Sequence, residues 1–279
     1  MTPWPRSLLA VSACLLALGG AACAQPAATP PSAPAADYQP SVGQSGKDVV
    51  WVPTSQTLVD RMLDMAGLTP QDRLVDLGSG DGRLVITAAQ RGARARGIEF
   101  NPQLVALSRR AASAEGVAAR ASFENADIFQ SDFRNATVVT LFLLPDLNMR
   151  LRPTLLAMEP GTRVVSNSFG MEDWQPDASS EVVEGCAGYC TALQWTVPAQ
   201  VAGTWKMGEK ELVLRQQFQV LQGELRGPEG STPIFDARLR GTQIGFNVGA
   251  ARYTGEVDGR SMRGSVDGQA FSASRVAAR

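Results

Sequence analysis

Apolar positions in the central part of the chain alternate between strand-like and helix-like spacing. Leu58, Met62, Leu63 and Ala66 form one helical stripe, which predicts a helix over residues 55–66. The predicted strands are residues 73–77, 95–100, 121–125, 137–143, 163–169 and 191–197, and the helices between them are residues 83–90, 102–115 and 147–158. Alternation of strand and helix favours an α/β fold with a mostly parallel sheet covered on both faces.

The hydrophobic pattern changes after Pro198, where short alternating runs are separated by turn residues. Asp258-Gly259 and Asp267-Gly268 are typical of tight hairpins. The alternating runs are residues 211–218, 220–226, 234–240, 243–248, 252–257, 261–266 and 269–274. An antiparallel meander of about eight strands follows, and a small barrel or rolled sheet is favoured because it hides the strand edges. We therefore expect two domains, over residues 47–200 and 201–279.

The N-terminal residues have a different composition. Arg6 precedes an apolar run over residues 8–18, and Ala22-Cys23-Ala24 matches a cleavage site, so residues 1–24 are interpreted as a secretory signal peptide. The Pro- and Ala-rich residues 25–46 then form a linker. This predicts a periplasmic or secreted protein. The alternatives are an envelope lipoprotein with lipid on Cys23, a retained leader, and a cytoplasmic protein; membrane association is expected only with the lipid or the retained leader.

The composition excludes several kinds of chemistry. The 279 residues contain no histidine, so no Ser-His-Asp or Cys-His catalysis and no His-ligated zinc site is available. Twenty-six basic residues against 27 acidic ones give a net charge of −1, which offers no reason to expect a nucleic-acid partner.

Two cysteines remain outside the leader, Cys186 and Cys190. A single C-x3-C pair without histidine is a weak metal signal, and no metal is predicted. In an oxidising compartment the pair is interpreted as a short disulfide that closes a loop. Two reduced thiols beside a strand are the alternative.

The segment VDLGSGDGR, residues 75–83, carries the strongest candidate chemistry. A buried strand ends at Asp76, and glycines at 78, 80 and 82 lead into a helix, which predicts a ligand at the carboxyl end of this strand. A nicotinamide fingerprint would place its third glycine at position 83, which is Arg83, so an oxidoreductase is a minor alternative. Glu99 ends the second strand, where an acid can accept both hydroxyls of a ribose, and Asp127 follows the third strand, where an adenine edge can lie.

These acids and glycines together resemble the class I S-adenosylmethionine-dependent methyltransferases. Val52-Pro53-Thr54, Phe142-Leu143-Leu144-Pro145 and the string RVVSNSF (residues 163–169) are similar to a subgroup related to the protein-lysine methyltransferases that modify the c-ring protein of ATP synthase. The resemblance covers residues 48–200 and implies a Rossmann-like fold, the cofactor S-adenosylmethionine, and transfer of its methyl group to an acceptor that is a small molecule or a protein, such as a lysine.

The resemblance also implies roles for individual residues. Leu144 and Pro145 would border the acceptor pocket, and no catalytic residue is assigned. The cofactor would be bound by Pro53, Thr54, Asp76, Gly78, Ser79, Gly80, Gly82, Glu99, Asp127 and Ile128. Because S-adenosylmethionine is made in the cytosol, export leaves an alternative open: a non-catalytic envelope binding protein built on the methyltransferase fold.

Overall fold

The first of two sheets is a seven-stranded mixed sheet. A computed structural model describes residues 38–276, and the prediction for residues 1–24 and most of the predicted linker fall outside them. The strand order is β3-β2-β1-β4-β5-β7-β6. The strands are β1 (Arg73–Leu77), β2 (Arg94–Glu99), β3 (Ala121–Asn125), β4 (Val138–Leu141), β5 (Arg163–Asn167), β6 (Ala178–Glu181) and β7 (Thr191–Thr196).

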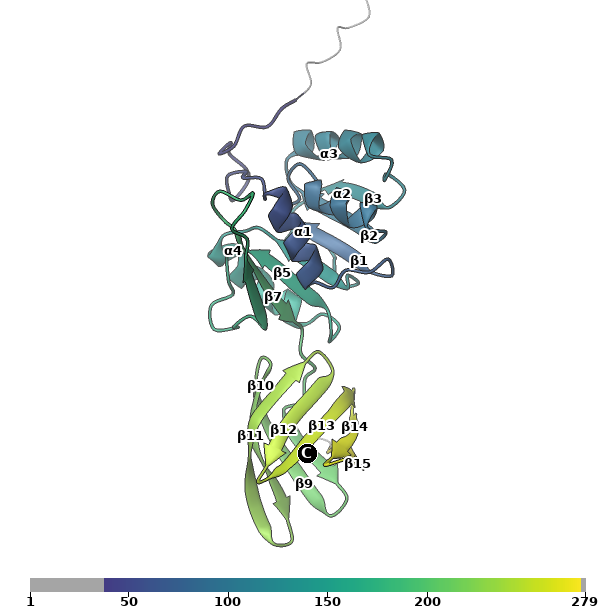
Figure 1. The fold of residues 1–279 in the computed structure, drawn as a ribbon, viewed down its shortest axis with the longest axis vertical. Helices are drawn as coiled ribbons and strands as arrows, with labels where there is room; N and C mark the ends of the chain where they lie inside the picture. The colour runs from purple at the N-terminus through teal and green to yellow at the C-terminus, as the bar shows by residue number, and fades with distance from the viewer. Residues whose placement is uncertain (1–37, 277–279) are drawn as a thin grey trace, which may run out of the picture. The chain divides into compact units, whose positions relative to one another are not determined.

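Four helices of the described residues cover the two faces of this sheet (Figure 1). On one face, α1 (Gln56–Met65), α2 (Arg83–Gln90) and α3 (Pro102–Ala114) bury an apolar cluster that includes Leu58. On the other face, α4 (Pro145–Leu156) packs its leucines against a second cluster with the same sheet. Burial of both faces explains why the central strands β1 and β4 are almost continuously apolar.

The strand order sets where a ligand can bind. β1 lies at the centre and pairs in parallel with β2 on one side and β4 on the other. The chain therefore leaves β1 in one direction and returns on its opposite side, which opens a crevice beyond the carboxyl ends of these strands. Within this sheet, β6 and β7 break the parallel pattern: β7 is antiparallel to both β5 and β6.

The second sheet is a closed antiparallel barrel. Its interior is filled by side chains such as Trp205, Phe246 and Met262, each at most 2% exposed. The barrel closes where β15 pairs with β8, so its strands leave no long unpaired edge. Its strands are β8 (Gly203–Met207), β9 (Lys210–Gln217), β10 (Val220–Gly227), β11 (Gly230–Arg240), β12 (Gln243–Val248), β13 (Ala251–Asp258), β14 (Ser261–Val266) and β15 (Gln269–Arg275).

The predicted fold class, a mostly parallel α/β sheet followed by an antiparallel barrel, is confirmed. The described residues fall in one compact unit, and the division into domains at residue 200 stays a prediction. The individual strand predictions missed β6 and β8. β6 is Ala-Ser-Ser-Glu, an exposed edge strand without an apolar side, and β8 alternates around a single buried residue, Trp205.

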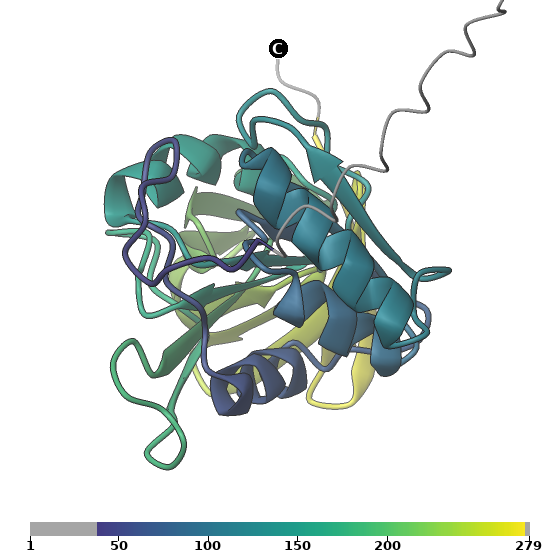
Figure 2. The same ribbon diagram turned by 90° about the horizontal axis from the view of Figure 1, so that it is seen from above.

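Two further features bear on the site and its surroundings. The loop between β6 and β7 projects beside the start of α1 (Figure 2), where the Thr57 hydroxyl donates a hydrogen bond to the Gly185 carbonyl oxygen. Across residues 38–276, none of the helices combines the length and apolar character needed to cross a bilayer.

Candidate functional site

A cavity opens beyond the carboxyl ends of β1, β2 and β4, and most of the predicted site residues line it. Two do not: Gly82 and Pro145 lie outside its wall. The predicted residues that line it are Pro53, Thr54, Asp76, Gly78, Ser79, Gly80, Glu99, Asp127, Ile128 and Leu144. Segments far apart in the sequence therefore meet at one place.

The glycine turn forms the floor of this cavity. Gly78 and Gly80 have positive φ angles of 79° and 54°, which L-residues rarely adopt. A Cβ atom on Gly80 would lie 2.7 Å from the Trp51 Nε1 atom, so the indole closes directly over the backbone of the turn. Gly82 has another task. A Cβ atom there would lie 2.7 Å from Ser108 and Phe123, so this glycine lets α2 begin against α3 and β3.

Asp76 is buried at the end of β1, at 7% exposure. Its Oδ1 atom accepts a hydrogen bond from the Thr140 hydroxyl of β4 at 2.7 Å. Burial raises the pKa of the Asp76 carboxyl to about 7, and the negative charges of Glu99 and Asp81 raise it further, against the opposing effect of Thr140. A cation placed beside this carboxyl would stabilise its ionised form.

Glu99 ends β2 and is held in place by backbone donors at both carboxylate oxygens. The Gly80 amide donates to Oε2 at 3.0 Å and the Asn101 amide donates to Oε1 at 2.8 Å. Burial raises the pKa of Glu99, while these amide contacts lower it. Each oxygen can accept a further hydrogen bond, so the carboxylate is oriented to take a pair of neighbouring hydroxyls.

A loop over residues 43–51 covers the side of the cavity near Asp127. Its two arms are joined by reciprocal hydrogen bonds between Gly43 or Gln44 and Trp51, each 2.9 Å long. Lys47 from this loop donates to Asp127 Oδ2 at 3.0 Å, and the Phe129 amide donates to Oδ1 at 2.9 Å. These donors lower the pKa of the Asp127 carboxyl, the Phe129 amide most strongly.

Arg83, the residue that departs from the nicotinamide fingerprint, connects two parts of the cavity wall. Its guanidinium pairs with Asp81 at 2.6 Å and donates to the Thr54 carbonyl oxygen at 2.8 Å. The Thr54 hydroxyl also accepts from Asn167 at 3.2 Å. A glycine at position 83 would remove the link between the glycine turn and the Pro53-Thr54 segment.

The far side of the same cavity is apolar. Leu143, Leu144 and Leu147 contribute from the end of β4 and the start of α4. Three aromatic rings, of Phe142, Phe169 and Tyr189, complete this side; their centroids are 5.3 to 6.1 Å apart. The arrangement can receive a flexible apolar chain next to the polar half of the cavity.

Comparisons with known proteins agree with this geometry. A family model described as the ANTKMT methyltransferase domain matches residues 76–178. A protein-lysine N-methyltransferase of Saccharolobus islandicus is 40% identical over 140 residues, covering 49% of this chain and 87% of its own. The chain belongs to the class I S-adenosylmethionine-dependent methyltransferases.

Two further relatives extend the comparison. A human lysine N-methyltransferase named for the c-ring protein of ATP synthase is 32% identical over 164 residues, which cover 54% of this chain and 70% of that protein. A solved structure from Salinibacter ruber, described as an RNA methyltransferase in complex with S-adenosyl-L-homocysteine, is 47% identical with a TM-score of 0.50, covering 54% of this chain and 96% of that one. The predicted enzyme class and cofactor, S-adenosylmethionine, are confirmed.

The residues of the cavity fit this cofactor. The glycine turn leaves backbone exposed where a Cβ atom would fill the space, and Glu99 is oriented for two hydroxyls. Asp76, with its raised pKa, suits the cationic methionine end, and Asp127 with Ile128 lies where the adenine is expected. The assignment of each residue to a part of the cofactor stays a prediction.

Sequence reasoning missed several residues of the cavity wall. Residues 44–46, which composition places in the linker, line the cavity, as do Trp51, Phe169 and Tyr189. Trp51 follows the expected motif by sequence position, but nothing in its neighbourhood signals that its ring lies on Gly80. Tyr189 is next to Cys190, and only the paired cysteines marked its loop as constrained.

The raised pKa of Asp76 predicts a pH-dependent affinity for the cofactor. Because the carboxyl is mainly protonated below pH 7 and S-adenosylmethionine is cationic, affinity should rise about tenfold between pH 6 and 8. Asp76→Asn keeps an acceptor for Thr140 but cannot ionise, so it should remove this dependence. Calorimetric titrations at several pH values measure both.

The control for this titration is Asp258→Asn, a substitution at an exposed residue of β13. It should bind with the pH dependence of the wild type. Equal slopes in the wild type and in Asp76→Asn would contradict the role of the buried carboxyl.

Proposed function

We propose that the protein methylates amines, and specifically the side chains of lysine residues in a protein. The observation that carries the proposal is the composition of the cavity wall. The described residues of that wall include five carboxylates, Asp48, Asp76, Asp81, Glu99 and Asp127, and two basic side chains, Lys47 and Arg83. Both basic side chains are already paired with carboxylates. This charge balance attracts a cationic amine and opposes a polyanion.

The shape of the wall supports an extended alkyl amine. The aromatic and leucine side is continuous with the cofactor side within one cavity. The four methylene groups of a lysine can lie against Phe142, Leu144 and Phe169 while the nitrogen reaches toward Asp76 and the glycine turn. Two of the relatives carry names that describe lysine methylation of a protein.

The chain's own residues have a limited chemical task. Bound S-adenosylmethionine supplies a methyl carbon activated by its sulfonium, which the lone pair of a neutral amine can attack in line. The protein must align that lone pair and exclude water. Trp51 and the loop over residues 43–51 cover the glycine turn, and the aromatic side excludes water from the other end. An acidic wall can also receive the proton that the amine loses.

A lysine acceptor predicts selective labelling of peptides. The purified protein, supplied with S-adenosylmethionine carrying a labelled methyl group, should label a library of peptides with one lysine each. The same library with arginine in place of lysine should stay unlabelled, and so should total RNA. Mass spectrometry of labelled peptides should locate the methyl group on the lysine nitrogen.

Gly80→Val is the inactive control, because its Cβ atom would lie 2.7 Å from Trp51 and occupy the cofactor's space. It should label nothing while keeping the circular dichroism spectrum of the wild type. Labelling of RNA with unlabelled lysine peptides would overturn the proposal and favour a nucleic-acid acceptor.

We further propose that the mature protein works in an oxidising compartment, the periplasm or the exterior of the cell. Two observations support this: the leader pattern of residues 1–24, and the disulfide between Cys186 and Cys190, whose Cα atoms lie 5.8 Å apart. Structural disulfides are rare where thiols are kept reduced. Such a location requires that the cofactor is carried out with the chain or supplied from the cell.

Export predicts a shorter and oxidised chain. Mass spectrometry of the protein from a fractionated cell should find a mature N-terminus near Gln25 and no free thiol at Cys186 or Cys190. An intact leader on cytosolic protein with two free thiols would contradict export, and would also remove the question of cofactor supply.

A further inference from the structure

The third ring of the aromatic side, Tyr189, differs from the other two in how it is held. Phe142 follows β4, and Phe169 follows β5, whose Ser166 hydroxyl donates to the Phe169 carbonyl oxygen at 2.7 Å. The Asn148 side chain of α4 donates to the same oxygen at 3.1 Å. Both phenylalanines are therefore positioned by the sheet and its helix. Tyr189 comes from the loop between β6 and β7, which contributes no other residue to the cavity wall described.

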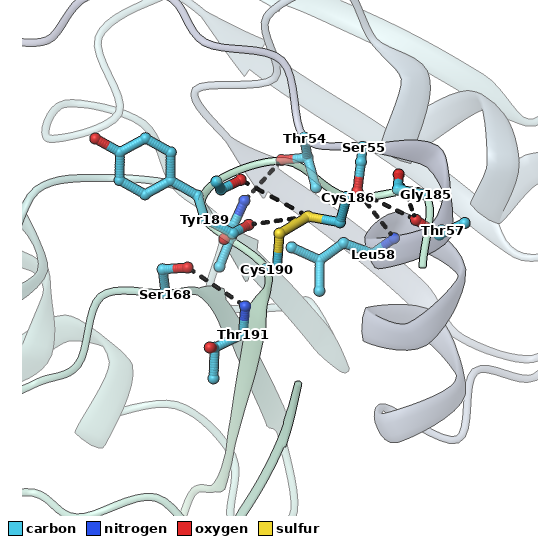
Figure 3. Close-up of a disulfide and its surroundings, with 12 residues drawn as sticks. Thr54, Ser55, Thr57, Leu58, Ser168, Gly185, Cys186, Tyr189, Cys190 and Thr191 are labelled. Atoms are coloured by element: carbon cyan, nitrogen blue, oxygen red, sulfur yellow. Dashed lines mark hydrogen bonds between the residues drawn. A yellow bond between two sulfur atoms is a disulfide. The ribbon is translucent and has the colours of Figure 1, made fainter. Parts of the chain in front are cut away.

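The disulfide closes this loop directly around Tyr189 (Figure 3). Cys186 and Cys190 are joined, which leaves only three residues between them, and Tyr189 is the last of these. Outside the bridge, Gly185 is tied to Thr57 of α1 at 3.0 Å, and Thr191 pairs with Ser168, whose amide donates at 2.7 Å. Each end of the bridged segment is thus anchored to a different part of the fold.

The backbone of Tyr189 shows that the loop imposes its conformation. Its φ angle is 56°, in the left-handed region that a bulky residue rarely occupies, and Gly188 before it is at 91°. Such a conformation persists only where the surroundings enforce it. Here it turns the ring toward Phe142 and Phe169, at centroid distances of 5.3 and 5.6 Å.

The ring is also left accessible. Tyr189 is 50% exposed although it lines the cavity, so it forms part of the opening and not of the core. Aromatic faces at an opening attract alkylammonium groups, and their edges pack against methylene chains. A cation that approaches the acidic wall of the cavity would pass this ring before it reaches the cofactor.

We propose that Tyr189 is a specificity-determining residue for the methyl acceptor, and that the Cys186–Cys190 bridge holds its ring at the opening of the acceptor channel. The proposal rests on the lysine methylation proposed above, and deepens it: the substrate class is an alkylammonium side chain recognised by three aromatic rings. Because the bridge acts only through Tyr189, its loss should weaken acceptor binding and leave cofactor binding unchanged.

The test measures initial rates of the full-length, oxidised protein against a lysine peptide from the labelled library. For Tyr189→Ala, the KM for the peptide should rise roughly threefold to tenfold. The kcat at saturating peptide and the calorimetric Kd for S-adenosylmethionine should change less than twofold. Tyr189→Phe keeps the ring and should behave as the wild type. A purely structural role would move the thermal midpoint and the cofactor Kd together, and phenylalanine would not restore the KM selectively.

The bridge is tested in two ways, so that a folding defect in one variant does not decide the matter. The double variant Cys186→Ser, Cys190→Ser and the wild type treated with a reducing agent should both raise the KM for the peptide, with an unchanged cofactor Kd. Val183→Ala is the matched control, because Val183 lies in the same loop, is 84% exposed and does not line the cavity. It should keep the wild-type KM under oxidising conditions.

The failures are distinguishable. If the wild type labels lysine peptides but Tyr189→Ala keeps its KM, or Tyr189→Phe loses as much as Tyr189→Ala, this inference alone is overturned. An unchanged KM after reduction overturns the role of the bridge. If the wild type labels no lysine peptide, the proposed function fails and the inference fails with it.

Discussion

The parallel pairing of β1 with β2 is the constraint on which the rest of the site depends. It aligns Asp76 with Gly97 and brings Glu99 to the same end of the sheet, and the Gly80 amide then donates to the Glu99 carboxylate. Two carboxyl groups are thereby held in a poorly solvated crevice, where each raises the free energy of the other's ionised form. The unfavourable charge is compensated when a cationic ligand with vicinal hydroxyls binds there, which is a description of S-adenosylmethionine.

Much of the fold was predictable because its signals are local. The Asp76 turn, the alternation of strands with helices and the Asp-Gly hairpins each lie within a few consecutive residues, and the structure has the elements they predict. β6 was not predictable, because an exposed edge strand needs no apolar side. Of the site, the cofactor half follows from residues near strand ends. Trp51 and Tyr189 reach the cavity through contacts with distant segments, which no local pattern encodes.

The barrel separates the roles of the two sheets. Its interior is filled by Trp205, Phe246 and their neighbours, which leaves no room there for an acceptor. The chemistry is therefore assigned to the mixed sheet, which is also the part that contains the match to the methyltransferase family model. The disulfide lies on that sheet as well, between β6 and β7, so the oxidising environment and the acceptor channel are connected through one short loop.

The most direct test of this account is a calorimetric titration of S-adenosylmethionine into the wild type, Glu99→Ala and the control Glu124→Ala, an exposed acid on β3. The account predicts one site in the wild type and the control. Affinity should be lower by roughly tenfold to a hundredfold in Glu99→Ala, because a charged acceptor for two hydroxyls is lost. A wild type that does not bind the cofactor, or a Glu99→Ala variant that binds it with unchanged affinity, would contradict the account.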